Sequence, residues 1–250
     1  MRRLFPFLLA AFAALIVASS AFASDTPATP EWTYSGKVGL HTQYLGGYYG
    51  MAVTANPVFQ ASLTASHKSG WFAGGWVDVP TGEQWNKGFG TELDWYLGHS
   101  ANVLNGHANL TLTTTLFDMG QTWNYRGDIQ EVAAEITANQ GRIRPFVYLG
   151  VALPYNHDVL EGGTAWNLGA YSDVQVGRQP VAIKAYLLGH DGVFGFAPQP
   201  ISAVRVNASV TRSVAKGQSL SYGLAIQRRV GPKTKSITSS LVVGSIVYSF

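Results

Sequence analysis

Residues Ile237–Phe250 read ITSSLVVGSIVYSF, and this stretch decides how the fold is built. Counted back from residue 250, every second position falls on one face of an extended strand, and these positions are apolar or small: Val242, Gly244, Ile246, Tyr248 and Phe250. An aromatic end on such a strand is typical of the closing strand of a bacterial outer-membrane β-barrel, where lipid offers no partner to an open backbone edge. The alternative is the buried terminal strand of a soluble β-sandwich, and the rest of the chain distinguishes the two.

The amino end predicts a secretory signal peptide that is cleaved after Ala23. A charged start at Arg2-Arg3 precedes an apolar run over Leu4–Val17 and a small-x-small site that ends in Ala23. The apolar run is short for an uncleaved membrane anchor, which is the other interpretation of such a segment. We therefore expect residues 1–23 to be removed and residues 24–250 to form one mature domain.

The composition favours a membrane barrel and argues against several other classes. Without Arg2 and Arg3, 15 basic residues face 14 acidic ones, so the net charge falls from +3 to +1 and no basic cluster suggests nucleic acid. The chain has no cysteine, which rules out disulfides and thiolate metal sites. Charged residues make up 12% of the chain, about half the share usual in soluble domains. The mature chain also has no apolar run long enough for a membrane-spanning helix.

Alternation of apolar and polar residues with a period of two predicts about twelve antiparallel strands in an all-β, up-and-down transmembrane barrel. Phe59, Ala61 and Leu63, for example, alternate with Gln60, Ser62 and Thr64. Most of the strands have about the length that a tilted strand needs to cross a bilayer. We expect them at Trp32–Tyr44, Val58–His67, Trp71–Val79, Phe89–Leu97, His107–Phe117, Ile129–Ala138, Arg142–Leu153, Ala165–Val174, Val181–Gly189, Ser202–Arg212, Ser219–Arg229 and Ile237–Phe250.

The connections between these strands alternate between short and long. Three short ones end in glycine, at Lys68–Gly70, Asn139–Gly141 and Ala215–Gly217, where a hairpin needs a left-handed residue. The others are mostly longer, and Gly98–Gly106 is the main exception in the short set. Short turns on one side and long loops on the other are typical of outer-membrane barrels, whereas a β-sandwich has no reason to alternate in this way.

The first third of the chain resembles the TorF-type porin family, which combines a P-x-x-Q strand, an S-G-aromatic hairpin and an E-L/I-D-aromatic-aromatic-x-G strand. The matching segments are Pro57–Leu63, Ser69–Trp76 and Glu92–Gly98. The chain departs from the family at Leu45-Gly46-Gly47, where Arg-Gly is common, and at Asp118-Met119-Gly120, where Tyr-Pro-Gly is common. The resemblance implies an outer-membrane barrel with a transport role, and it implies no particular solute.

In such a barrel the polar face of the strands is the working surface, because it faces the lumen. We expect twelve charged side chains to line it, six basic and six acidic: Lys37, Asp78, Glu92, Asp94, Glu131, Glu135, Arg142, Arg144, Asp173, Lys184, Arg205 and Arg229. The balance suggests a transverse field across a narrow hydrophilic pore, or ion pairs that partly fill it. Glu135 and Arg144 nearly oppose each other in the expected hairpin, so we predict a cross-strand ion pair between them. The alternative is that the charges only brace or solvate the wall.

The sequence argues against an enzyme and predicts no cofactor. The six histidines are scattered, and Ser66 and His67 are adjacent in a strand, so their side chains face opposite ways. His157-Asp158 and His190-Asp191 are expected in outer loops, where loop polarity explains them better than a metal site does. Aromatic residues near strand ends are interpreted as interfacial girdles: Trp32, Tyr34, Tyr44, Trp71, Trp95, Tyr248 and Phe250.

The sequence thus favours a bacterial outer-membrane channel for passive diffusion of small hydrophilic solutes through a mixed-charge lumen. A closed barrel with a structural, adhesion or partner-binding role is the alternative, and an outer-membrane hydrolase is a more distant one. The expected partners are outer-membrane lipid and lipopolysaccharide, small solutes, and the barrel-assembly machinery, which would recognise Tyr248 and Phe250.

Overall fold

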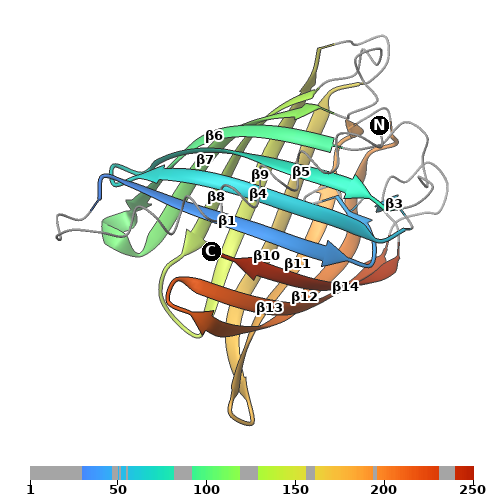
Figure 1. The fold of residues 1–250 in the computed structure, drawn as a ribbon. Helices are drawn as coiled ribbons and strands as arrows, with labels where there is room; N and C mark the ends of the chain where they lie inside the picture. Colours follow the sequence, from blue (N-terminus) through green and yellow to red (C-terminus); the bar gives the residue numbers. More distant parts are fainter. Residues whose placement is uncertain are drawn as a thin grey trace, which may run out of the picture.

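The structure is a computed structural model that describes residues 30–46, 50, 52–54, 56–81, 92–118, 129–155, 161–193, 196–230 and 240–250. Twelve antiparallel strands form a closed barrel (Figure 1), and the predicted signal peptide lies outside the described residues. The barrel strands are β1 (Trp32–His41), β4 (Val58–His67), β5 (Trp71–Pro80), β6 (Glu92–Val103), β7 (Ala108–Asp118), β8 (Ile129–Ala138), β9 (Ile143–Pro154), β10 (Gly163–Val176), β11 (Gln179–His190), β12 (Gln199–Ala215), β13 (Gln218–Arg229) and β14 (Leu241–Ser249). A short pair, β2 (Tyr44–Leu45) and β3 (Ala52–Thr54), forms a separate small sheet, and η1 (Leu104–Gly106) is one turn of 3-10 helix.

The barrel closes between its first and last strands, as the terminal sequence predicts. Each strand pairs with its neighbours in the chain, and β14 pairs with β1 in the register Lys37–Ser249 to His41–Ser245. Phe250 lies directly beyond this ladder and exchanges two backbone hydrogen bonds with Gly36, at N···O distances of 2.8 and 3.0 Å. The prediction of an all-β, twelve-stranded closed barrel is confirmed.

The outer face of the barrel is apolar. Large side chains on alternate positions are about half exposed to the surroundings, among them Leu97, Leu112, Leu149, Leu168, Leu224 and Ile246. Leaving one such side chain in water forfeits about 1.5–3 kcal/mol of transfer free energy, so a belt of them around a barrel is built to face lipid. Trp71 and Trp95 belong to this outer face, as expected.

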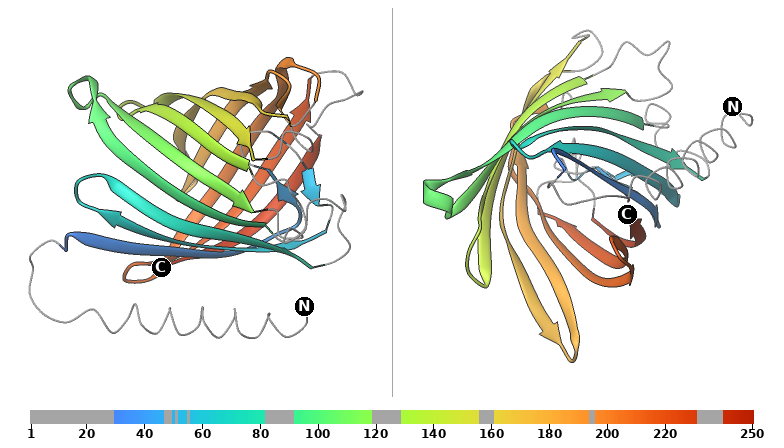
Figure 2. Two further views of the ribbon diagram at one scale, coloured as in Figure 1. Left: turned by 90° about the horizontal axis from the view of Figure 1, so that it is seen from above. Right: turned by 60° about the vertical axis from the view of Figure 1, so that its left-hand side comes forward.

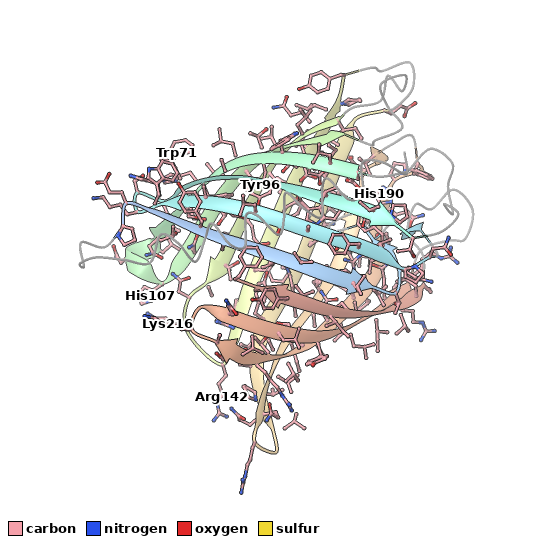
Figure 3. All side chains as sticks on the ribbon, viewed as in Figure 1. Trp71, Tyr96, His107, Arg142, His190 and Lys216 are labelled. Atoms are coloured by element: carbon pink, nitrogen blue, oxygen red, sulfur yellow. The ribbon has the colours of Figure 1, made fainter. Side chains whose placement is uncertain are left out.

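One end of the barrel carries short turns and the other carries long connections (Figure 2). In Figure 3 the side chains of Trp71, His107, Arg142 and Lys216 mark the short-turn end, and His190 lies toward the other end. β6 continues to Val103, six residues beyond the predicted end, so the connection from β6 to β7 is also a short turn. The predicted exception at Gly98–Gly106 was therefore wrong, since Gly98, His99 and Ser100 continue the ladder with β7.

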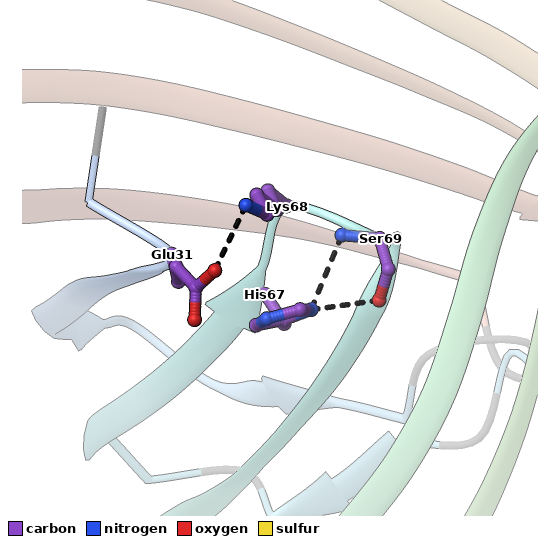
Figure 4. A network of polar contacts seen from close by, with 4 residues as sticks. All are labelled: Glu31, His67, Lys68 and Ser69. Atoms are coloured by element: carbon purple, nitrogen blue, oxygen red, sulfur yellow. Dashed lines mark hydrogen bonds and ion pairs between the residues drawn. The ribbon is translucent and has the colours of Figure 1, made fainter. Parts of the chain in front are cut away.

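Polar contacts brace the first short turn (Figure 4). Lys68 forms an ion pair with Glu31 at 2.8 Å, and the His67 Nδ1 lies 2.7 Å from the Ser69 hydroxyl. Gly70 closes the turn with φ of +97°, the left-handed geometry predicted for it. The ion pair is more than half exposed, so it is worth less than about 1 kcal/mol, and the turn depends mainly on its glycine.

Candidate functional site: the barrel interior

The interior face carries the polar residues of each strand. Backbone register places eleven of the twelve predicted lumen residues on the face opposite the exposed apolar belt. The exception is Arg142, which lies in the turn before β9 begins and is exposed there. The prediction that Arg142 lies in a strand of the barrel wall was therefore wrong, because β9 starts one residue later than expected.

Acidic residues gather on one wall of the interior, formed by β5 to β8, toward the long-connection end. Asp78, Glu92, Asp94 and Glu131 are each less than 9% exposed. Gln60 Nε2 donates to Asp78 at 2.9 Å, and the Tyr148 hydroxyl donates to Glu131 at 2.6 Å. Among the described residues, Asp78 Oδ2 and Asp94 Oδ1 have no hydrogen-bond partner. This acidic wall is therefore a buried concentration of acceptors.

Basic residues lie on the facing wall, formed by β11 to β13. They are Lys184, Arg205 and Arg229, on strands that lie across the barrel from the acidic wall in the strand order, although the long side chain of Lys184 brings its ammonium to within 4.0 Å of Glu135 on β8. Arg205 is 4% exposed and donates to Gln227 Oε1 at 2.8 Å, to the Tyr186 hydroxyl at 3.0 Å and to the Gly46 carbonyl at 3.2 Å. Three neutral acceptors thus fix the orientation of a buried positive charge.

The connection after β1 folds into the interior between the two walls. The ring of Tyr44 on β2 lies 5.5 Å from that of Trp76, which points inward from β5. On the other side, Arg205 binds the Gly46 carbonyl and Gln227 Nε2 donates to the Gly50 carbonyl at 2.7 Å. In the left view of Figure 2, β2 and β3 lie inside the outline of the barrel. This connection therefore narrows the long-connection end.

Tyr44 differs from its predicted role. β1 ends at His41, so Tyr44 is part of the inward connection and not of an interfacial girdle. Burial, together with the carboxylates of Glu92 and Asp94, raises the pKa of the Tyr44 phenol well above its ordinary value. The phenol therefore stays protonated, and its hydrogen bond with Glu92 ties the connection to the acidic wall.

An aromatic cluster fills part of the interior between the walls. Lys184 Nζ lies 4.3 Å from the ring centroid of Phe146 and 4.7 Å from that of Tyr171, distances at which a cation is attracted to an aromatic face. Its ammonium is also 4.0 Å from Glu135 Oε2. Phe146 is buried with Tyr186, so this side of the barrel is packed.

The predicted ion pair between Glu135 and Arg144 was wrong. Both residues face the interior, but Glu135 stands opposite Tyr148, and Arg144 instead binds Asp173 at 2.8 Å. The connection between β8 and β9 covers residues 139–142, one residue more than predicted, and the paired ladder already ends at Thr137–Phe146, so the register is shifted by three residues from the predicted hairpin. Shifts of register change the partners of a side chain along the strand.

The interior opens toward the short-turn end. Lys37 and Asp173 are exposed although they lie on the interior face, and the Arg144–Asp173 pair is likewise accessible. Hydroxyl side chains such as Thr211 and Ser221, which are 2.7 Å apart, line this part. The barrel therefore combines an accessible vestibule at the short-turn end with a packed constriction toward the other end.

A cavity of about 270 Å³ remains beside the inward connection. It lies against β4, β1, β14, β13 and β12, and polar side chains in its lining include His41, Gln60, Arg205, Asn207, Ser209 and Ser245. The inner faces of β13 and β14 carry small residues here, Gly223, Ala225 and Ser245, which leave the space open. Sequence reasoning missed Asn207, Gln227 and Tyr186, although their alternation with apolar neighbours already indicated the interior face.

The described residues contain no group of three or more His, Cys, Asp or Glu side chains that could hold a metal ion. His67 and His99 pack on the outer face, at centroid distances of 4.8 Å from Trp32 and 5.0 Å from Trp71. His157 and Asp158 lie outside the described residues. No helix in the described part of the chain is long and apolar enough to span a membrane.

The class of fold follows from this geometry: a closed, antiparallel twelve-stranded barrel with an apolar outside and a polar inside is the fold of outer-membrane porins. Within that class, the chain belongs to Gcw_chp, described as a bacterial protein family of unknown function, whose model matches residues 24–223. A comparison with curated proteins finds no match.

Solved structures of porins have the same architecture at very low sequence identity. The NanC porin matches with a TM-score of 0.53 and 8% identity over 87% of this chain and 99% of its own. The KdgM porin in complex with disordered oligogalacturonate matches with a TM-score of 0.52 and 6% identity, over 87% of this chain and 97% of its own. The COG4313 outer membrane channel from Pseudomonas putida F1 matches with a TM-score of 0.52 and 12% identity, over 90% of this chain and 99% of its own. At these identities the likeness concerns the fold alone.

Proposed function

We propose that this protein is a bacterial outer-membrane channel for passive diffusion of small hydrophilic solutes. The observation that carries the proposal is a closed barrel with a lipid-facing belt outside and two polar walls of opposite charge inside. A twelve-stranded barrel is wide enough for a lumen where side chains leave room, and the vestibule and the cavity are such places.

The opposed walls support a selective constriction. A solute that enters between the acidic wall and the basic wall meets a transverse field, which favours molecules with a dipole or with separated charged and hydroxyl groups. The resemblance of Pro57–Leu63 and Glu92–Gly98 to TorF-type porins agrees with a transport role. Lipopolysaccharide contact and recognition of Tyr248 and Phe250 by the assembly machinery remain predictions.

Conductance in planar lipid bilayers tests the proposal. The full mature chain, refolded and checked for heat-modifiable migration, should give discrete conductance steps above the background of detergent alone. A correctly folded protein that gives no steps would contradict the channel.

A closed barrel with a structural or partner-binding role is the second candidate. It is favoured by the inward connection at Arg205 and Gln227 and by the aromatic cluster around Lys184, which together occupy much of the constriction. Absence of conductance both in the wild type and in a variant that releases the inward connection, such as Gln227→Met, would favour this second role.

A further inference from the structure

We propose that the 270 Å³ cavity is a binding subsite for a neutral sugar in its ring form, a hexopyranose. The C–H face of the ring would lie on an apolar floor formed by Gly223, Ala225 and Val243, with the hydroxyl groups toward polar side chains at the edges. This inference deepens the proposed function and rests on it, because the solute would reach the cavity through the lumen.

The size of the cavity fits a single sugar ring. Its volume corresponds to about nine water molecules, at roughly 30 Å³ each. Five neighbouring strands of the barrel contribute to the lining, so the hollow belongs to the barrel wall itself. A second sugar ring would extend from the cavity into the lumen.

The apolar floor lies on the inner faces of β13 and β14. Ala225 stands opposite Val243 in the pairing of these strands, and both alternate with exposed residues of the outer belt, Ile226 and Val242. Gly223 lies two residues before Ala225 on the same face and adds no side chain. One face of a pyranose ring consists mainly of C–H groups, which gain free energy when such a floor removes them from water.

Polar side chains border the floor on both sides. On β12, Asn207 lies beside Ala225 in the register, and Ser209 follows two residues along on the same face. On the other side, Ser245 on β14 pairs with His41 on β1. All of these residues line the cavity. Hydroxyl and imidazole groups both donate and accept hydrogen bonds, as sugar hydroxyls do, so this rim matches the edge of a sugar ring.

One group in the rim is a buried acceptor that needs a donor. Asn207 Oδ1 is buried and has no hydrogen-bond partner among the residues that the structure describes. Buried acceptors in folded proteins are almost always satisfied, and an O–H group of a bound solute is a suitable donor. We therefore expect the nearest sugar hydroxyl to donate to Asn207.

The lining favours a neutral solute over a charged one. Apart from Arg205 and a histidine, its side chains cannot carry charge. The guanidinium of Arg205 donates to Gln227, Tyr186 and Gly46, so it holds the wall and the inward connection, and we assign it no contact with the solute. A carboxylate would lose its hydration in the cavity without a basic group reserved for it.

The rigid ring matters as much as the hydroxyl groups. An acyclic polyol such as sorbitol can reach the same rim, but it has no fixed C–H face for the floor. Its flexible chain also loses more conformational freedom on binding than a preformed ring does. A ring sugar satisfies the floor and the rim together.

Ligand-observed saturation-transfer NMR on the full mature chain in detergent tests the subsite. Dissociation constants are measured for D-glucose, D-galactose and D-mannose, with sorbitol and D-glucuronate as comparison solutes. We expect at least one hexose to bind about threefold or more tightly than either comparison solute. The inference would be overturned if none of the three hexoses binds more tightly than sorbitol, or if glucuronate binds most tightly.

Variants then locate the binding. Asn207→Leu should weaken binding of the preferred hexose by about three- to tenfold, since a buried hydrogen bond is lost. Ala225→Phe, which fills the space above the floor, should abolish binding. Ile226→Phe is the matched control, because Ile226 is the next residue of β13 and lies on the outer belt, so binding should be unchanged.

Folding of each variant is checked by heat-modifiable migration. Unchanged affinity in folded Asn207→Leu and Ala225→Phe would refute the subsite. If neither variant folds, the comparison of solutes on the wild type decides.

The bilayer experiment separates this inference from the proposed function. Conductance steps without hexose binding would refute the subsite and leave the channel intact. Hexose binding that depends on Asn207 and Ala225, in a protein without conductance, would refute the channel and support the subsite in a closed barrel.

Discussion

At the scale of single residues, Gly36 and Phe250 define the point where the barrel closes. The two residues exchange backbone hydrogen bonds, and a Cβ atom at position 36 would overlap the ring of Phe250. Glycine is favoured here because a Cβ atom would force the ring of Phe250 to move, while the backbone conformation itself is ordinary.

We therefore predict that Gly36→Val destabilises the barrel by about 1–3 kcal/mol, the usual penalty of overpacking. The measurement is the midpoint of urea unfolding, followed by heat-modifiable migration. In a Phe250→Ala background the same substitution should cost much less, because the overlap is gone. An equal cost in both backgrounds would show that the ring is not the cause.

A second prediction compares two polar contacts of different burial. Tyr148→Phe removes the hydrogen bond to the buried Glu131 and should cost about 1–3 kcal/mol of stability. Arg144→Ala breaks the accessible pair with Asp173 and should cost less than about 1 kcal/mol. The free energy of unfolding of both variants is measured by urea unfolding at constant salt. A larger loss of stability for Arg144→Ala than for Tyr148→Phe would contradict the view that Glu131 is buried and that the Arg144–Asp173 pair is accessible.

At the scale of strands, alternation determined which face a side chain occupies but not which partner it has. Glu135 and Arg144 were correctly expected on one face, because a period of two depends only on neighbours in sequence. Their pairing depends on the number of residues in the turn at 139–142, and neither Asn139 nor Gly141 specifies that number uniquely.

The inward connection could not be predicted for a related reason. Residues Tyr44–Thr54 have the composition of an ordinary loop, and the positions of Gly46 and Gly50 depend on contacts with Arg205 and Gln227, more than 150 residues away in the chain. Only the closed barrel brings these residues together. Trp76 was expected in a strand, but its contact with Tyr44 depends on the inward path of the connection and could not be read from alternation.

Release of this connection should widen the constriction. Gln227→Met keeps the side-chain length but removes the bonds to Arg205 and to the Gly50 carbonyl. We predict larger single-channel conductance than in the wild type, measured in planar bilayers. The matched control is Gln175→Met, in the part of the β10–β11 hairpin that extends beyond the pairing of β10 with β9, which should leave conductance unchanged. Smaller or equal conductance in Gln227→Met would contradict a constricting role.

At the scale of the whole molecule, the charges divide between opposite walls. The number of strands, their order and the closure were all predictable, since membrane spanning demands a closed sheet with an even strand count. The segregation of charge was not, because it requires the order of strands around the barrel to be combined with the height of each residue along its strand.

Ion selectivity provides a test of this division. Neutralising the acidic wall with Asp78→Asn and Asp94→Asn should shift the reversal potential in a KCl gradient toward that of chloride. Asp173→Asn in the exposed vestibule should shift it less, and its effect should fade at high salt because accessible charges are screened. Equal shifts from both positions would argue against a selective constriction at the acidic wall.

The seam between β1 and β14 has a mechanical consequence. It holds five register pairs between two end contacts, Gly36–Phe250 and Thr42–Gly244, whereas every other pairing of barrel strands in the described chain has eight to twelve. Under heat or tension the cylinder should open lengthwise there first, leaving all twelve strands joined as one curved sheet with β14 at its edge, still held to β13 by nine register pairs.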